Sequence, residues 1–208
     1  MRDAIILILF ILAGASCNAQ IQMVCDSCWC EGTIHYYNLY EGHEAIATNI
    51  YDDKRAQSTL DHTDDHRAQI FLPKANYSVS RVRLKLQRIG YLTAQDLIVE
   101  IREVDGGDNP IGPVVSYGVK PFSEIFLDTV AAWYPIKMSP GTIQSGQEYA
   151  IILHLDFADS ENKVIWNINY KGYSGGYAIW TNNGYRENGY WQKNYELDRL
   201  FEIWGNKL

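Results

Sequence analysis

The stretch 81–87, Arg-Val-Arg-Leu-Lys-Leu-Gln, decides the fold class because hydrophobic and polar residues alternate along it. In an extended chain Val82, Leu84 and Leu86 would point to one side and the polar residues to the other. This period of two is typical of an antiparallel strand with one buried face and one wet face. Residues 97–102 repeat the pattern, and the turn 105–112, Asp-Gly-Gly-Asp-Asn-Pro-Ile-Gly, is typical of a hairpin.

Similar short segments continue to the end of the chain. Strands are predicted at 68–72, 77–89, 96–104, 114–118, 132–138, 148–156, 164–170, 176–181 and 200–205, and turns at 139–141, 145–146, 174–176 and 182–184. Short strands at this spacing predict an all-β protein, either an antiparallel β-sandwich or a barrel. The charged residues on the outer faces predict a wet surface of mixed charge, not a site; they are Arg81, Arg83, Lys85, Glu100 and Arg102.

The N-terminal residues predict export. Arg2 precedes an apolar run at 4–12 and small residues at 13–16, which is the order of an export signal. The run is shorter than the roughly 20 residues that span a bilayer. We expect cleavage after Ala19, which gives a signal peptide at 1–19, a Cys- and Tyr-containing leader at 20–45 and a β-sandwich domain at 46–208. The alternative is a lipid on Cys17, because residues 14–17 resemble a bacterial lipoprotein box. Both predict an extracellular or cell-surface location.

All four cysteines lie early in the chain, at Cys17, Cys25, Cys28 and Cys30. Outside the cytosol their default fate is disulfide formation or lipid attachment. Cleavage after Ala19 would leave three of them, an odd number, so one thiol would be free or would join a second chain. Zinc is the alternative for the last three with His35, but no second cysteine pair follows downstream.

Charge and length limit the partners. The net charge is −7 and no Lys/Arg cluster is present, which argues against nucleic acid and anionic lipid as partners. Membrane attachment is therefore expected only through a lipid on Cys17. About 190 mature residues suffice for one β-sandwich core.

The order of several segments resembles the choice-of-anchor R type of surface domain. The segments are Ala68-Gln69-Ile70-Phe71, 82–84, 97–102, Asp105-Gly106-Gly107, 110–114, 132–133, 139–140, 146–153, 173–178 and 200–205. The resemblance covers about residues 50–205 and leaves out the cysteine-containing leader. It implies a jelly-roll-like sandwich similar to carbohydrate-binding modules, and it implies no catalytic residues.

Aromatic residues gather between positions 166 and 191, among Asn and Gly. Flat rings stack on sugar rings, and amide side chains offer donors and acceptors to hydroxyl groups. The first aromatics are expected to be framework, because strand aromatics are usually buried; they are Trp166, Tyr170, Tyr173 and Tyr177. The residues around the 182–184 turn are expected to be exposed and are the predicted ligand site: Trp180, Asn182, Asn183, Tyr185, Tyr190 and Trp191.

Acidic loops are a second candidate site. Residues 52–53 and 61–66 could gather oxygen ligands for a structural calcium ion, although their spacing matches no defined calcium loop. Solvated turn carboxylates are the commoner alternative. His62 and His66 would converge only on a helix, and His154 is expected to be an ordinary surface imidazole. No cofactor other than this calcium ion is predicted.

No motif for catalysis is present: there is no Gly-x-Ser-x-Gly, no His-Glu-x-x-His and no phosphate-binding Gly loop. The sequence therefore predicts a non-enzymatic binding or adhesion module that recognises a glycan or another surface component. The alternative is a structural subunit of an extracellular assembly. Its copies would associate through the cysteine-containing leader and through the edge strands of the sandwich.

Overall fold

The structure is a computed structural model, and it describes residues 43–50, 56–91, 95–127, 130–170, 173–182 and 190–208. Within these ranges the chain forms antiparallel β-strands and one short 3-10 helix, Phe122–Glu124, and contains no α-helix. The predicted all-β, antiparallel class is therefore confirmed. No helix in the described ranges is both long and apolar enough to cross a membrane.

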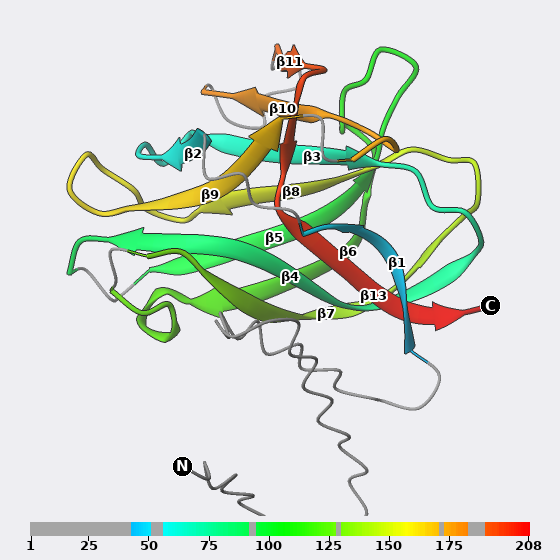
Figure 1. Cartoon of the computed structure of the whole chain (residues 1–208), viewed down its shortest axis with the longest axis horizontal. Helices are drawn as coiled ribbons and strands as arrows, with labels where there is room; N and C mark the ends of the chain where they lie inside the picture. Colours follow the sequence, from blue (N-terminus) through cyan, green and yellow to red (C-terminus); the bar gives the residue numbers. More distant parts are fainter. Residues whose placement is uncertain (1–42, 51–55, 92–94, 128–129, 171–172, 183–189) are drawn as a thin grey trace, which may run out of the picture. The chain divides into compact units, whose positions relative to one another are not determined.

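The first sheet has seven strands arranged around a long central strand, β4 (Figure 1). On one side β4 pairs with β13 through residues 77–84 and with β9 through 86–89, and on the other side it pairs with β7. The strands are β1 (His43–Asn49), β2 (Ala56–Leu60), β4 (Tyr77–Ile89), β7 (Ala132–Ile143), β9 (Lys163–Tyr170), β12 (Leu197–Arg199) and β13 (Phe201–Lys207).

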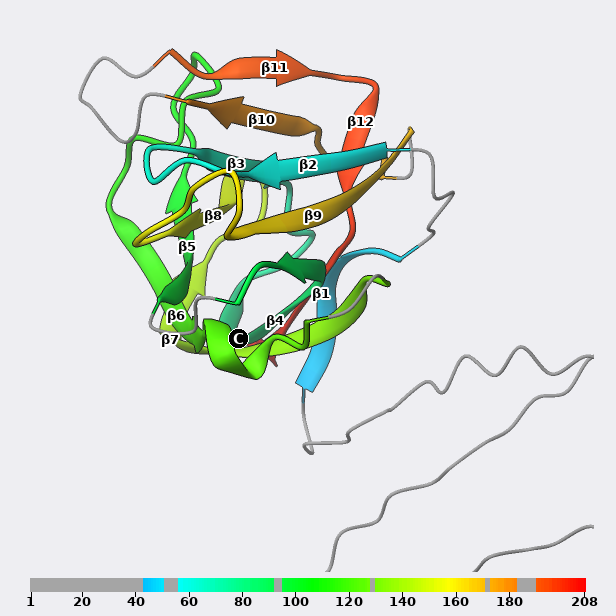
Figure 2. The same cartoon turned by 90° about the vertical axis from the view of Figure 1, so that its left-hand side faces the viewer.

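The second sheet has six strands in the order β11-β10-β3-β8-β5-β6. They are β3 (His66–Phe71), β5 (Asp96–Glu103), β6 (Val114–Pro121), β8 (Tyr149–Leu155), β10 (Ala178–Thr181) and β11 (Gln192–Asn194). The two sheets pack into a β-sandwich-like arrangement, with β10 and β3 near β2 and β9 of the first sheet (Figure 2).

The main core lies between the sheets and confirms the predicted alternation. Val82, Leu84 and Leu86 of β4 are fully buried, and so are Leu97, Val99 and Ile101 of β5. The two strands do not pair with each other: β4 belongs to the first sheet and β5 to the second. The two alternating stretches therefore contribute to the same core from opposite sides.

The edges of the sheets meet where β6 approaches β7. The Ser116 hydroxyl donates to the Ser139 carbonyl, and the Tyr117 N–H donates to the Ser139 hydroxyl at 2.9 Å. Gly118 and Gly141 allow this approach, because a Cβ on either residue would overlap a backbone carbonyl of the opposite strand. The glycines thus close one side of the sandwich.

The prediction of a turn at 139–141 is wrong, because β7 continues to Ile143. A register shift against β4 between Val79 and Arg81 accommodates Pro140, whose missing N–H would otherwise interrupt the ladder. Strands β2, β11 and β12 were not predicted. Strand β1 begins at His43, before residue 46, where the β-sandwich domain was expected to begin. Tyr170, expected to be framework, is 51% exposed, whereas Trp166 is fully buried.

The outer face of β4 is less wet than expected. Arg83 makes an ion pair with Glu202 at 2.7 Å, and its guanidinium lies 5.5 Å from the centre of the Trp133 ring. Arg81 lies over the Trp204 ring at 5.7 Å. The guanidinium groups and aliphatic chains of Arg81 and Arg83 cover aromatic rings, so these side chains form part of the packing of that face.

Candidate functional site

The structure divides the predicted aromatic site between the two faces of β10. Trp180 lines a pocket between the sheets, whereas Tyr190 and Trp191 line a groove on the outer face of the second sheet. The division follows from the strand period, since Trp180 and its neighbour Ile179 point to opposite faces and Ile179 packs in the same cluster as Trp191. The predicted residues therefore form two sites, which we call the inner pocket and the outer groove.

Trp191 is buried, which corrects the expectation that it is exposed. Only 3% of it is accessible, and it packs on the outer face of the second sheet in a small hydrophobic cluster. The other buried members are Ala68, Ile70, Val104, Ala150, Ile152 and Ile179. Its ring also meets the edge of the His66 ring, with centroids 6.5 Å apart. Trp191 is thus the floor of the groove and has no free face for a sugar.

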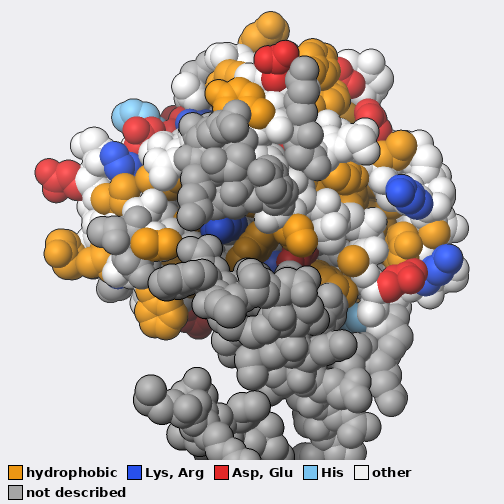
Figure 3. Space-filling view, viewed as in Figure 1, with side chains coloured by type: hydrophobic (Ala, Val, Ile, Leu, Met, Phe, Trp, Pro, Cys, Tyr) orange, Lys and Arg blue, Asp and Glu red, His pale blue; other side chains and the backbone are white. Residues whose placement is uncertain are grey.

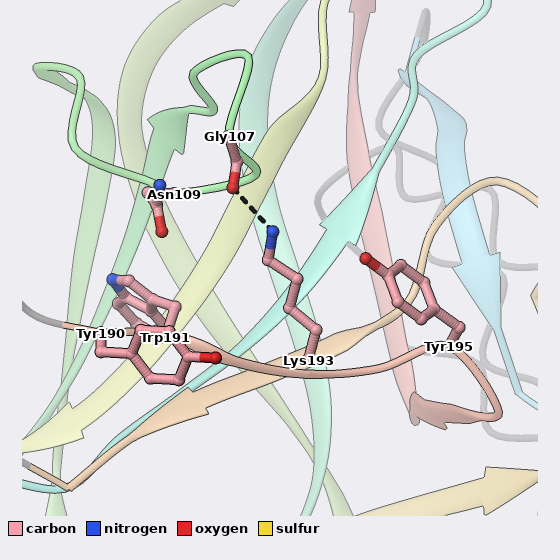
Figure 4. Close-up of a pocket in the computed structure, with 6 residues that line it drawn as sticks. All are labelled: Gly107, Asn109, Tyr190, Trp191, Lys193 and Tyr195. Carbon is pink, nitrogen blue, oxygen red and sulfur yellow. Dashed lines mark hydrogen bonds between the residues drawn. The ribbon is translucent and has the colours of Figure 1, made fainter.

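The outer groove is lined by Tyr190, Trp191, Lys193 and Tyr195 on one side and by the 107–109 turn on the other (Figure 4). Its volume is about 380 Å³. Tyr190 is 80% exposed and Tyr195 is 64% exposed, so both rings are open to a ligand. The Tyr195 ring rests against the Tyr177 ring, with centroids 4.6 Å apart.

The turn that forms the far wall is held rigidly. The Asp105 carboxylate accepts hydrogen bonds from the backbone N–H groups of Gly107 at 2.9 Å and Asn109 at 2.7 Å, which lower its pKa. Lys193 of β11 donates to the Gly107 carbonyl at 2.7 Å and pairs with Asp108 at 2.9 Å, and this pairing lowers the pKa of Asp108. The Asn109 side chain, which donates to Asp105 at 3.3 Å, is held in this turn as part of the groove wall.

The inner pocket opens between β2, β9 and β12 of the first sheet and β3 and β10 of the second, and its volume is about 380 Å³. Trp180 lies directly opposite Arg67 in the β10–β3 pair, so both side chains are on the face that looks toward the first sheet. Arg199 enters from β12 and lines the same pocket. Asn182 lies at its rim, where its side-chain oxygen accepts a hydrogen bond from Arg67 at 3.0 Å.

The predicted acidic loop at 61–66 is organised around Asp65. Its carboxylate accepts from the N–H groups of Asp61 and His62 at 3.1 and 3.2 Å and pairs with Arg67 at 3.2 Å. Burial raises the pKa of Asp65, against the lowering by Arg67. Across the described ranges, no group of three or more His, Cys, Asp or Glu side chains is placed to hold a metal ion.

His154 is not an ordinary surface imidazole. Its ring stacks on the ring of His66, with centroids 4.7 Å apart and planes inclined by 29°. Burial, followed by the neighbouring His66, lowers the pKa of His154 to about 4, and burial also lowers the pKa of His66. The alternation of β8 correctly placed His154 on the outer face, but that face is partly covered beside Trp191.

Part of the predicted site lies outside the described residues: Asn183, Tyr185, Asp52, Asp53 and the cysteines Cys17, Cys25, Cys28 and Cys30. The sequence analysis missed Arg67, Lys193, Tyr195 and Arg199. Arg199 did carry a signal, because it is a charged residue directly before the apolar run of β13. Nothing local in the sequence indicates that Arg67 and Arg199 meet.

The surface and the comparisons with known proteins add little to this geometry. On the face shown in Figure 3, the described Lys, Arg, Asp and Glu side chains are scattered among hydrophobic ones. A scan against protein-family models and a search of the curated proteins found no match for this chain.

Proposed function

We propose that this protein is a non-catalytic glycan-binding module of the cell exterior and that the outer groove is its binding site. The observation that carries the proposal is the pair of exposed rings, Tyr190 and Tyr195, on one side of a groove whose far wall holds the Asn109 amide. Exposed aromatic rings stack on the apolar faces of sugars. The Asn109 side-chain nitrogen donates to Asp105 at 3.3 Å, and its oxygen can accept a hydrogen bond from a sugar hydroxyl.

The rigidity of the groove supports this proposal. Lys193 ties β11 to the 105–109 turn, and Trp191 is packed beneath, so the two walls are held before a ligand arrives. A preformed site loses less conformational entropy on binding than a mobile one. The tyrosines need only two side-chain torsions each to be ordered, which favours them as contact residues.

The test is binding to a glycan array, followed by titration of the best neutral oligosaccharide. We expect Tyr190→Ala and Tyr195→Ala each to weaken binding by about fivefold, since stacking of one ring contributes on the order of 1 kcal/mol. Tyr91→Ala is the matched control, because Tyr91 is 84% exposed and lies at the end of β4, away from the groove. Unchanged affinity in both groove variants would refute the proposal.

We also propose the finer fold and location. The segment order described above supports a jelly-roll-like sandwich of the choice-of-anchor R type, and the two packed antiparallel sheets are compatible with it. The charge and apolar pattern of the first residues supports export. The mass of the mature N-terminus would test export and would distinguish a free Gln20 from a lipid on Cys17.

Assembly into an extracellular structure is the second candidate. The observation that favours it is a group of exposed apolar residues just after β6, where Phe126 is 74% exposed, Leu127 44% and Val130 68%. Exposed apolar residues close together favour association. Sedimentation of the mature protein over a range of concentrations tests this candidate, and Phe126→Ser should shift any association toward monomer.

A further inference from the structure

The inner pocket holds a buried cation that makes no ion pair with any residue the structure describes. Arg199 is 2% exposed, and its guanidinium donates from Nε to the Ala68 carbonyl and from Nη2 to the Ile179 carbonyl, both at 3.1 Å. It also lies over the Trp166 ring at 5.1 Å. All of these partners are uncharged.

Two of the nearby carboxylates are engaged elsewhere. Asp65 pairs with Arg67, the second buried guanidinium, and Asp198 accepts hydrogen bonds from the Gln69 amide at 3.0 Å and the Tyr173 N–H at 2.9 Å. In the described part of the chain, no acidic side chain pairs with Arg199. Buried charges in proteins are normally paired, because removing a lone charge from water is costly. The pocket is therefore built to receive an anion.

The other walls indicate which kind of anion. Trp180 lines the pocket, and so do Gln57, Ser58 and Asn182, whose side chains carry amide and hydroxyl groups. An aromatic wall with several neutral donors and acceptors fits a polar ring that carries hydroxyl groups. A volume of about 380 Å³ is near the lower end of small-ligand sites, so one ring fits and a long polymer does not.

The charge balance favours a carboxylate over a phosphate. Arg67 pairs with Asp65, while Arg199 and Asp61 bring one positive and one negative charge to the lining, so Arg199 is the guanidinium of the pocket without an acidic partner among the described residues. A singly charged carboxylate matches this one cation and can accept from the guanidinium N–H groups that do not bond the two carbonyls. Asp61 would repel a doubly charged phosphate more strongly than a singly charged carboxylate.

We propose that the inner pocket binds an acidic sugar of the hexuronate class, with its carboxylate on Arg199 and its ring against Trp180. Binding would place an anion in direct contact with the Arg199 guanidinium, whose hydrogen-bond partners in the described residues are carbonyls. Burial and the neighbouring Arg67 both lower the pKa of Arg199, and a bound anion would oppose this shift. This site uses none of the residues of the outer groove, so the two proposals can fail independently.

The first experiment compares two sugars that differ by the carboxylate alone. Glucuronate and glucose are titrated into the whole mature protein by calorimetry, with thermal shift as a second readout. We expect glucuronate to bind at least about tenfold more tightly, because a hydrogen bond to a charged group contributes about 1.5–3 kcal/mol. Equal binding of the two sugars, no binding of either, or tighter binding of inorganic phosphate or acetate than of glucuronate would overturn the proposal.

The second experiment locates the site. Trp180→Ala should weaken glucuronate binding by about tenfold, and Arg199→Lys by at least as much, because lysine keeps the charge but loses the fork. Tyr190→Ala in the outer groove and Arg83→Gln on the outer face of β4 are the controls and should bind as the parent does. Circular dichroism checks that each variant is folded. If Arg199→Lys does not fold, Trp180→Ala decides: unchanged affinity in that variant would overturn the proposal.

Discussion

The stacked rings of His66 and His154 bring two titratable groups to 4.7 Å of each other on the outer face of the second sheet. Burial lowers the pKa of both, and His66 adds to the lowering for His154, whose pKa falls to about 4. Glu100 opposes the lowering for both rings and Arg102 adds to it for His154. At neutral pH both histidines are therefore uncharged.

This pair makes stability depend on pH. In the unfolded chain the histidines have the ordinary pKa of about 6.5. Below that pH the unfolded state therefore binds protons that the folded state does not bind. The free energy of unfolding should fall as the pH drops from about 7 to about 4, by on the order of 2 kcal/mol after allowance for partial solvent access. Urea unfolding at a series of pH values measures this fall.

A matched pair of variants isolates the histidine contribution. His154→Gln should flatten the slope between pH 7 and 4, whereas His62→Gln should leave it intact because His62 is exposed. The same slope in His154→Gln as in the parent protein would show that other groups are responsible.

Trp191 should contribute to stability far more than to ligand binding. Trp191→Ala empties a buried site in the outer cluster, and we expect a loss of about 3 kcal/mol in the free energy of unfolding, as for other buried aromatic truncations. Tyr190→Ala, one residue earlier and 80% exposed, should change stability by less than about 0.5 kcal/mol. Equal stability of the two variants would contradict the burial of Trp191.

The glycine contacts between β6 and β7 should be sensitive to a single methyl group. Gly118→Ala and Gly141→Ala each place a Cβ against a backbone carbonyl that cannot move without the strand, so we expect a loss of about 2 kcal/mol. Gly106→Ala is the control, because nothing lies within 4 Å of its added Cβ. The midpoints of thermal unfolding compare the three variants, and equal midpoints would mean that the strand edges do not approach as described.

Asp65 should contribute more to the stability of the folded chain than its neighbour Asp64 in the 61–66 loop. Asp65→Asn removes the partner of buried Arg67, and we expect the free energy of unfolding to fall by about 3 kcal/mol, the low end for a broken buried pair. Asp64→Asn, an exposed neighbour, should be within about 0.5 kcal/mol of the parent. Chemical unfolding of both variants gives the comparison, and a neutral Asp65→Asn would show that Arg67 does not depend on it.

Local pattern predicted the strands with regular alternation well. The β4 strand begins and ends where the sequence analysis expected, at Tyr77 and Ile89, because alternation over that length has no competing structure. The local pattern predicted the wrong structure where contacts between distant residues decide whether a segment is extended or turned. The 139–141 segment has turn residues but remains extended, since β4 on one side and β6 on the other hold β7 in place.

The alternation of residues alone shows which side of each regular strand is apolar, because neighbouring side chains of an extended chain must point in opposite directions. Which strands pair, and what covers each face, is seen only in the folded chain. Those outcomes depend on contacts between distant residues, such as the meeting of Arg199 with the carbonyls of Ala68 and Ile179. The alternating stretch 81–87 therefore predicted an antiparallel strand with one buried face, whereas the separation of Trp180 from Trp191 required the folded chain.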